Sequence, residues 1–420
     1  MAYLTIEGGR PLHGRIPVQC AKNSVLPVLA ATVLAGDTCR LVACPRLSDV
    51  ETAAEILRHL GCTAQWDGGD LLVDTTHISR WDIPETLMRR MRSSVIFLGA
   101  ILSRCGQAEL SYPGGCELGP RPIDLHLTAL RTLGADITEL GGSLLCRAAH
   151  LQGADIVLTL PSVGATENAI LAACGAEGVT VISNAAREPE IVDLQDFLQK
   201  MGVAIHGAGT SSITVQGGAR HGCTHRCIGD RIAAATYLCA AAASGGKITL
   251  EGINYRHLAT VTTALHQAGC RLQCESDAIT LESDGHLRAV APVRTSPYPG
   301  FPTDAQALLM AALLRSEGAT MFVENMFESR YRHVPELLRM GADIRLEGRV
   351  AVVCGVPELH AAAVRSTDLR GGAALAVAAL QAQGITQIHD IHHIQRGYMD
   401  LAGDLRSLGA EIATAEGSEI

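Results

Sequence analysis

Residues 111–122, SYPGGCELGPRP, place one cysteine in a loop that is rich in glycine and proline. Gly114 and Gly115 free the backbone, and the prolines stiffen the flanks. Arg121 follows Cys116 by five residues, so its guanidinium can favour the thiolate and prepare a nucleophile or a proton donor near neutral pH. The alternative is an inert loop thiol, because most cysteines of intracellular proteins are unreactive. The spacing alone leaves both interpretations open.

Two further motifs place cations beside the start of an apolar helix. In AKNSVLP, Lys22 and Asn23 precede such a helix, and a helix N-terminus with an adjacent ammonium binds anions. The simpler interpretation makes Asn23 the N-cap and leaves Lys22 in solvent. In MRRMRSSV, Arg92 stands nearest the apolar run, so it is the arginine we expect to reach a binding site. A cluster of this kind is otherwise a solvated face.

Candidate binding residues also lie just after the cysteine loop and at the start of a later helix. PIDLH supplies Asp124 and His126. PSVGATENAI, residues 161–170, is a turn that feeds a helix, where backbone N–H groups can receive a phosphate or the turn can simply be capped.

The second half of the chain carries a candidate base and candidate anion ligands. FPTDAQ opens a helix with Thr303 and Asp304, so Asp304 is either a general base or, like Thr303, a routine N-cap. STDLRGG and HIQRGY each place an arginine beside glycine, namely Arg370 and Arg396, and Asp368 again precedes a helix. An arginine fork suits carboxylate and phosphate groups.

The segment HGCTHRC, residues 221–227, resembles a metal site because histidine and cysteine alternate in it. Its one-residue spacing fits no standard structural zinc pairing, and no second ligand pair lies at a suitable distance. We therefore predict no metal and no organic cofactor, and interpret the segment as a polar interdomain strand.

A sixfold repeat must position these residues. A leucine-bearing helix, a glycine and a strand-like alternation recur at intervals of 67 to 73 residues, and Ala-rich helices that run into β-branched strands interleave with them. Each glycine is expected to close its helix in the left-handed conformation. The repeated glycines are Gly61, Gly134, Gly202, Gly269, Gly341 and Gly409. Six equal units predict two lobes of three, with α/β layering and the apolar Ala-rich helices buried inside.

Composition and charge limit the classes of function that the chain can have. The chain is 47% apolar and 18% charged with a formal charge of −9, so nucleic-acid binding is excluded as its main role and any anion must meet a local cationic cluster. No signal peptide is visible, and the apolar run of residues 25–35 is too short to span a bilayer. We expect a cytoplasmic protein whose fourteen cysteines are reduced thiols.

The combined motifs resemble the UDP-N-acetylglucosamine 1-carboxyvinyltransferase family. PGGCELGPRPIDLH, PSVGATEN, AAREPEIVDL, FPTD, ENMFESRYRHVPEL, TDLR and HIQRGY occur in this order over nearly the whole chain. The resemblance implies an inside-out α/β barrel of six βαβαββ-type repeats. It places one lobe at residues 22–229 and the other at residues 1–21 and 230–420, with the active site in the interlobe cleft.

The resemblance also implies a reaction. The enolpyruvyl group of phosphoenolpyruvate passes to the 3-hydroxyl of UDP-N-acetylglucosamine, which begins peptidoglycan precursor synthesis and so serves cell-wall biogenesis, cell shape and division. Cys116 would lie on a mobile loop and be the residue that fosfomycin alkylates. Some members carry aspartate at this position. We expect a monomer with small-molecule substrates and no nucleic-acid or membrane partner.

The family's site residues transfer to positions of this sequence as expectations. The catalytic residues would be Cys116, Asp304, Lys22 and Arg396. Phosphoenolpyruvate would meet Lys22, Asn23, Arg92, Arg121, Arg370 and Arg396. The UDP-sugar would meet Arg92, Arg121, Pro122, Ile123, Asp124, Leu125, His126, Ser162, Val163, Gly164, Asp304 and Met326, and Asp368 would lie in the cleft.

Two other functions remain open. One is the related 3-phosphoshikimate 1-carboxyvinyltransferase activity, which the PGGC loop and the SVGATEN turn argue against. The other is a catalytically idle UDP-sugar-binding regulator.

Overall fold

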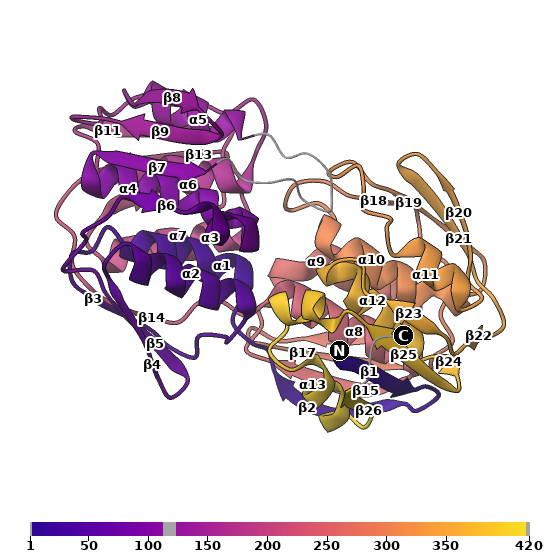
Figure 1. Ribbon diagram of the computed structural model, residues 1–420. Helices are drawn as coiled ribbons and strands as arrows, with labels where there is room; N and C mark the ends of the chain where they lie inside the picture. Colours follow the sequence, from indigo (N-terminus) through magenta and orange to yellow (C-terminus); the bar gives the residue numbers. More distant parts are fainter. Residues whose placement is uncertain (1, 112–122, 417–420) are drawn as a thin grey trace. The chain divides into compact units, whose positions relative to one another are not determined.

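The computed structural model describes residues 2–111 and 123–416, apart from the Arg92 side chain. These residues form two compact units (Figure 1). The amino-terminal unit comprises residues 20–111 and 123–228, and the carboxy-terminal unit comprises residues 2–19 and 229–416. Cys116, Arg121 and Pro122 lie outside the described residues.

The amino-terminal unit repeats one arrangement of helices and strands three times. Its helices are α1 (Lys22–Thr32), α2 (Ser48–His59), α3 (Glu85–Arg90), η1 (Arg92–Ile96), α4 (Phe97–Cys105), α5 (Asp124–Thr132), α6 (Val163–Ala173) and α7 (Pro189–Lys200). Its strands are β3 (Thr38–Leu41), β4 (Thr63–Asp67), β5 (Asp70–Asp74), β6 (Asp82–Ile83), β7 (Gln107–Ser111), β8 (Asp136–Leu140), β9 (Ser143–Arg147), β10 (Asp155–Val157), β11 (Val179–Ser183), β12 (Ala204–His206), β13 (Ser212–Gln216) and β14 (Thr224–His225).

The carboxy-terminal unit repeats the arrangement with the start of the chain included. Its helices are α8 (Arg231–Ser244), η2 (Tyr255–Leu258), α9 (Ala259–Gln267), α10 (Thr303–Ala312), η3 (Leu313–Arg315), α11 (Val334–Arg339), α12 (Leu369–Ala379), η4 (Ile391–Arg396) and α13 (Leu401–Ser407). Its strands are β1 (Ala2–Glu7), β2 (Leu12–Pro17), β15 (Gly246–Glu251), β16 (Arg271–Cys274), β17 (Ala278–Ser283), β18 (Val293–Arg294), β19 (Ala319–Val323), β20 (Asp343–Glu347), β21 (Val350–Cys354), β22 (Leu359–His360), β23 (Ala363–Arg365), β24 (Ala382–Gln383), β25 (Ile385–His389) and β26 (Glu411–Glu416).

The four-stranded sheets of the described chain share one topology. In each, a parallel strand pair is extended by two antiparallel strands, as in the orders β14-β3-β5-β4, β6-β7-β9-β8 and β10-β11-β13-β12. The carboxy-terminal unit has β2-β15-β17-β16, β18-β19-β21-β20 and β23-β25-β1-β26. Strand β1 enters the last sheet between β25 and β26, with Leu4 opposite Ile388. The amino-terminal segment therefore completes two sheets whose other strands come from the second half of the chain.

The repeated glycines mark the helix-to-strand junctions as predicted. All six have φ between 90° and 111°, the left-handed region that an L side chain avoids. In each repeat the helix ends two residues before the glycine and the strand begins two residues after it, as with α2, Gly61 and β4.

The Ala-rich helices form the buried layer. Helices α8, α10 and α12 pack on one another inside the carboxy-terminal unit, and α1, α4 and α6 occupy the interior of the other (Figure 1). Alanine lets helix axes approach closely, so three helices fit within the surrounding sheets. The strands alternate, as in β13, where Ile213 and Val215 are buried and their neighbours are exposed. The predicted mixed α/β fold is confirmed.

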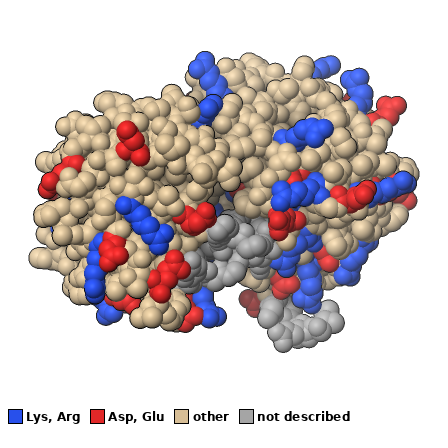
Figure 2. Space-filling view, turned by 90° about the horizontal axis from the view of Figure 1, so that it is seen from above, with Lys and Arg blue, Asp and Glu red and all other residues tan. Residues whose placement is uncertain are grey.

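The surface carries charges of both signs. On the face shown in Figure 2, Lys and Arg side chains are interspersed with Asp and Glu, and neither sign forms a continuous field. Among the described residues, every helix is too short or too polar to cross a membrane.

Candidate active site

The first turn of α1 holds the candidate anion-binding pair of the amino-terminal unit. Ala21 is the N-cap, and Lys22 and Asn23 are the first two helical residues, so the interpretation of Asn23 as the cap is wrong. Lys22 does not extend into solvent either. Its side chain is 13% exposed, and its Nζ lies 3.1 Å from Oδ2 of Asp49, which is 3% exposed. An ammonium at a helix N-terminus is a suitable anion-binding group.

The arginines of MRRMRSSV separate into different roles. Arg89 and Arg90 pair with Glu85 and Glu55 at the surface, which is the solvated face expected of a charge cluster. Arg92 begins η1, immediately before the buried helix α4, and its side chain lies outside the described part of the chain.

The side chain of His126 is oriented by Asn168, a residue that the sequence analysis did not single out. The Nδ2 of Asn168 lies 2.7 Å from Nδ1 of His126 and 2.8 Å from the carbonyl oxygen of Val95. The Asn168 amide oxygen accepts from the backbone N–H of Gly99 at 2.7 Å. The amide must donate to His126, so the ring proton lies on Nε2. Asn168 belongs to the quoted PSVGATEN motif, so the signal was available.

The Ser162 turn packs directly against this histidine. Ser162 is the N-cap of α6, and its hydroxyl oxygen accepts from the N–H of Ala165 at 3.4 Å. Gly164 lies so near His126 that an added Cβ would come within 3.0 Å of the ring. A side chain at this position would displace the imidazole by a few tenths of an ångström, so glycine favours the close approach.

The predicted residues around His126 differ in exposure. Ile123 is buried, Leu125 and Val163 are half-buried and Asp124 is exposed.

Three buried carboxyl groups lie near the start of α7. Glu167 is buried, and burial together with the charges of Glu190 and Glu188 raises its pKa well above the usual range. Glu188 and Glu190 are themselves 8% and 3% exposed. One of them, Glu188, is the N-cap residue of α7. Acidic groups this close to a helix N-terminus gain from its dipole.

We expect the stability of the protein to fall with rising pH because of Glu167. A carboxyl group with a raised folded-state pKa binds its proton more tightly when folded. Its stabilising contribution is therefore complete below the unfolded pKa of about 4.5 and is lost as the pH rises through the folded value, by about 1.4 kcal/mol per pH unit. Glu167→Gln should raise the free energy of unfolding at pH 8 and leave it little changed at pH 4. Urea unfolding at both pH values measures this, and equal effects would contradict it.

The carboxy-terminal unit holds Asp304 between two arginines. Its Oδ1 lies 2.6 Å from Nη2 of Arg330, and its Oδ2 lies 3.3 Å from Nη2 of Arg370. The two guanidinium side chains are 2% and 3% exposed, whereas Asp304 is 28% exposed. Two buried guanidinium groups thus fix a carboxylate that is itself partly exposed. Arg330 was missed, although it belongs to the quoted ENMFESRYRHVPEL motif.

The capping interpretation of Thr303 and Asp304 is wrong. Pro302 is the N-cap of α10, and no side chain caps that helix. The hydroxyl of Thr303 instead donates to Glu324 at 3.0 Å.

Arg370 is held by a buried chain of hydrogen bonds. Burial acts to lower its pKa, but the charge of Asp304 and the hydroxyl of Tyr398 raise the pKa overall. Tyr398 accepts from Arg370 at 3.3 Å and lies 2.7 Å from the Thr236 hydroxyl. Asp368 is the N-cap of α12 and accepts from the N–H groups of Arg370 and Gly371.

Two predicted residues of this unit lie nearer the surface. Arg396, the last residue of η4, is half-buried, and Met326 is 39% exposed.

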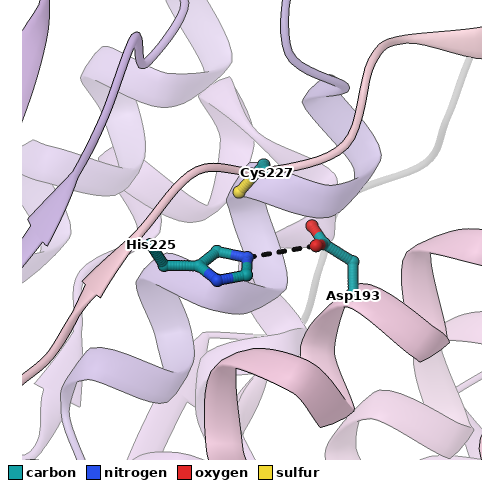
Figure 3. Close-up of side chains that lie close together, drawn as sticks. All are labelled: Asp193, His225 and Cys227. Atoms are coloured by element: carbon teal, nitrogen blue, oxygen red, sulfur yellow. Dashed lines mark hydrogen bonds and ion pairs between the residues drawn. The ribbon is translucent and has the colours of Figure 1, made fainter. Parts of the chain in front are cut away.

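The metal-like segment HGCTHRC contains the two-residue strand β14, in which Thr224 is exposed and His225 is buried. Strand β14 pairs with β3 at the edge of a sheet of the amino-terminal unit, so the segment belongs to that unit and the interpretation as an interdomain strand is wrong. One ligand-type atom each from Asp193, His225 and Cys227 lies within 4.8 Å of the other two (Figure 3). Burial raises the pKa of the Cys227 thiol well above its usual range, which keeps it protonated. The other two groups are bonded to each other, with 3.0 Å between His225 Nε2 and Asp193 Oδ1.

Residues 6–405 match the sequence profile of EPSP synthase (3-phosphoshikimate 1-carboxyvinyltransferase). The UDP-N-acetylglucosamine 1-carboxyvinyltransferase 2 of Caldanaerobacter subterraneus subsp. tengcongensis is 46% identical, over 98% of this chain and 99% of its own length. The UDP-N-acetylglucosamine 1-carboxyvinyltransferase of Zymomonas mobilis is 45% identical, over 99% of this chain and all of its own. The chain belongs to the UDP-N-acetylglucosamine 1-carboxyvinyltransferase family. The predicted resemblance is confirmed.

Solved structures place this carboxyvinyltransferase in the enolpyruvyl transferase fold. The enolpyruvyl transferase NikO from Streptomyces tendae superposes with a TM-score of 0.89 at 26% identity, and 99% of each chain is covered. EPSP synthase from Acinetobacter baumannii superposes with a TM-score of 0.76 at 18% identity, which shows a shared fold only. Each unit of this carboxyvinyltransferase family member carries part of the predicted site.

Proposed function

We propose that the chain transfers the enolpyruvyl group of phosphoenolpyruvate to the 3-hydroxyl of UDP-N-acetylglucosamine and releases phosphate. The near full-length identity to carboxyvinyltransferases of this name carries the proposal. The product is the first committed intermediate of peptidoglycan, so the protein serves cell-wall synthesis, cell shape and division. The thirteen cysteines that the structure describes are free thiols, which supports a cytoplasmic location.

The reaction needs groups of three kinds. Cations must hold a trianionic substrate, and we assign this to Lys22, Arg92, Arg121 and Arg396, with Asn23 beside them. A base must take the proton of the sugar hydroxyl, and the exposed side of the Asp304 carboxylate suits this. An acid must protonate C3 of the enolpyruvate, and Cys116 is our candidate.

The bonds and protons of the proposed addition and elimination steps balance without a cofactor. The 3-oxygen bonds to C2 of phosphoenolpyruvate while C3 gains a proton, which forms a tetrahedral intermediate that still bears the phosphate. The bond from C2 to the phosphate oxygen then breaks, C3 loses a proton, and the vinyl ether and inorganic phosphate remain.

The UDP-sugar contacts are assigned to the region around His126. Ser162, Val163 and Gly164 stand at the N-terminus of α6, which supports binding of a diphosphate there. His126, which carries its proton on Nε2, supplies a further donor. Ile123, Asp124 and Leu125 adjoin it in sequence.

The test is phosphate release from phosphoenolpyruvate with each of two acceptors. We expect release with UDP-N-acetylglucosamine and none with shikimate 3-phosphate. Release with shikimate 3-phosphate alone would make the protein an EPSP synthase. Release with neither, together with UDP-sugar binding in calorimetry, would make it a regulator.

A further inference from the structure

A chain of hydrogen bonds in the amino-terminal unit begins at Lys200 and ends at Asp193. Nζ of Lys200, at the end of α7, lies 3.0 Å from Nδ1 of His225. An ammonium only donates, so Nδ1 accepts and the ring proton must lie on Nε2. Nε2 then donates to Oδ1 of Asp193 at 3.0 Å (Figure 3). Lys200 thus sets the donor-to-acceptor direction of both hydrogen bonds.

The second oxygen of Asp193 receives two more donors. The hydroxyl of Ser24 donates to Oδ2, and the backbone N–H of Ile228 lies 3.3 Å from it. Ser24 is 0% exposed, and Asp193 and His225 are each 3% exposed. A buried carboxylate is costly unless hydrogen bonds surround it, and here three donors do so. Phe197 supports the imidazole edge-on at 5.4 Å between ring centroids.

This arrangement leaves no lone pair of His225 for a metal ion. Nδ1 is occupied by Lys200, Nε2 carries the proton, and the thiol of Cys227 is protonated. The side chains of Lys200, His225, Asp193 and Ser24 therefore form one continuous hydrogen-bond network.

The network ends on the helix turn that carries the candidate phosphoenolpyruvate ligands. Ser24 is the third residue of α1, next to Asn23 and two residues after Lys22. The same turn is tied to the segment after β14 by its backbone, because the N–H of Ala21 donates to the carbonyl of Ile228 at 2.8 Å. The side-chain network and this bond fix the first turn of α1 against α7 and the β14 segment.

We propose that Asp193, His225 and Ser24 are positioning residues that hold the first turn of α1, and with it Lys22 and Asn23, in the geometry that binds phosphoenolpyruvate. The proposal rests on the proposed function for the identity of the ligand. A misplacement of about 1 Å in a binding group can cost around a hundredfold in rate. Loss of the hydrogen bond from Ser24 to the buried Asp193 should therefore affect binding by the neighbouring Lys22 and Asn23.

The test compares Ser24→Ala, Asp193→Asn and the double variant with wild type in the steady-state assay. We expect the KM for phosphoenolpyruvate to rise about tenfold in each single variant, as for loss of one charge-assisted hydrogen bond. The Kd for UDP-N-acetylglucosamine should stay within about twofold, and the double variant should be no worse than Asp193→Asn, because both changes remove one shared interaction. The control is Asp155→Asn, an exposed carboxylate on β10 of the same unit, which should behave as wild type.

A second measurement needs no substrate. Amide hydrogen exchange of residues 21–27 should be faster in Ser24→Ala than in wild type or Asp155→Asn. Folded variants with unchanged KM and unchanged exchange would overturn the proposal, as would additive effects in the double variant. If the wild-type protein releases no phosphate, the proposed function fails, and the exchange measurement alone then decides whether the network holds the turn.

Discussion

Replacing Cys116 by serine is expected to lower turnover at least about a hundredfold and to abolish covalent labelling by fosfomycin. A serine hydroxyl is a far weaker acid than a thiol, so it is a poor proton donor to C3. It also stays un-ionised at neutral pH, so it offers no anionic nucleophile to fosfomycin. Turnover is measured by phosphate release, and labelling by the mass of the intact protein.

Cys116→Asp is the matched variant for this prediction. Some members of the family carry aspartate at this position, so a carboxyl group should restore proton transfer while labelling stays absent. Labelling of Cys116→Ser at another cysteine would show that the loop assignment is wrong. Burial raises the pKa of several of the other thiols, for example that of Cys62 to about 12, so they should react slowly.

Replacing Asp304 by asparagine is expected to lower kcat by about 10²- to 10⁴-fold and to change the Kd for UDP-N-acetylglucosamine much less. A base acts in the transition state, whereas the amide retains the shape and part of the hydrogen bonding of the ground state. The variant also leaves Arg330 and Arg370 without their shared carboxylate, so we expect a lower melting temperature. Rates must therefore be normalised to folded protein.

The control for this prediction is Asp343→Asn, an exposed carboxylate on β20 of the same unit. It should leave kcat, UDP-sugar affinity and melting temperature near the wild-type values. A loss of UDP-sugar affinity in Asp304→Asn as large as its loss of kcat would mean that Asp304 binds the ground state and is not the base.

Much of the fold could be predicted from local signals. Gly61 and its five counterparts recur at near-equal spacing, and each sits where a helix must reverse into a strand with a positive φ. The Ala-rich helices carry no polar face, so burial was their only stable environment. The short parallel strands such as β6 and β14 were harder to foresee, because a two-residue strand leaves almost no periodicity in the sequence.

Helix starts were the least certain part of the site. Asn23 and Asp304 have the composition of N-caps, yet each is the second residue of its helix, and Ala21 and Pro302 occupy the cap positions. Propensity describes how often a residue type caps a helix, and at Asp304 tertiary partners overrode it. Asp304 gives its oxygens to Arg330 and Arg370 instead of to the backbone.

The sequence by itself determined the six repeats, the buried helices and the motifs in which the candidate ligands stand, because these depend on residues close together along the chain. Only the tertiary structure decided which side chains form hydrogen bonds and ion pairs with one another. Lys22 meets Asp49 across 27 residues, His126 meets Asn168 across 42, and Ser24 meets Asp193 across 169. Each pair joins two different helices that meet only in the folded unit, and no local spacing encodes such a contact.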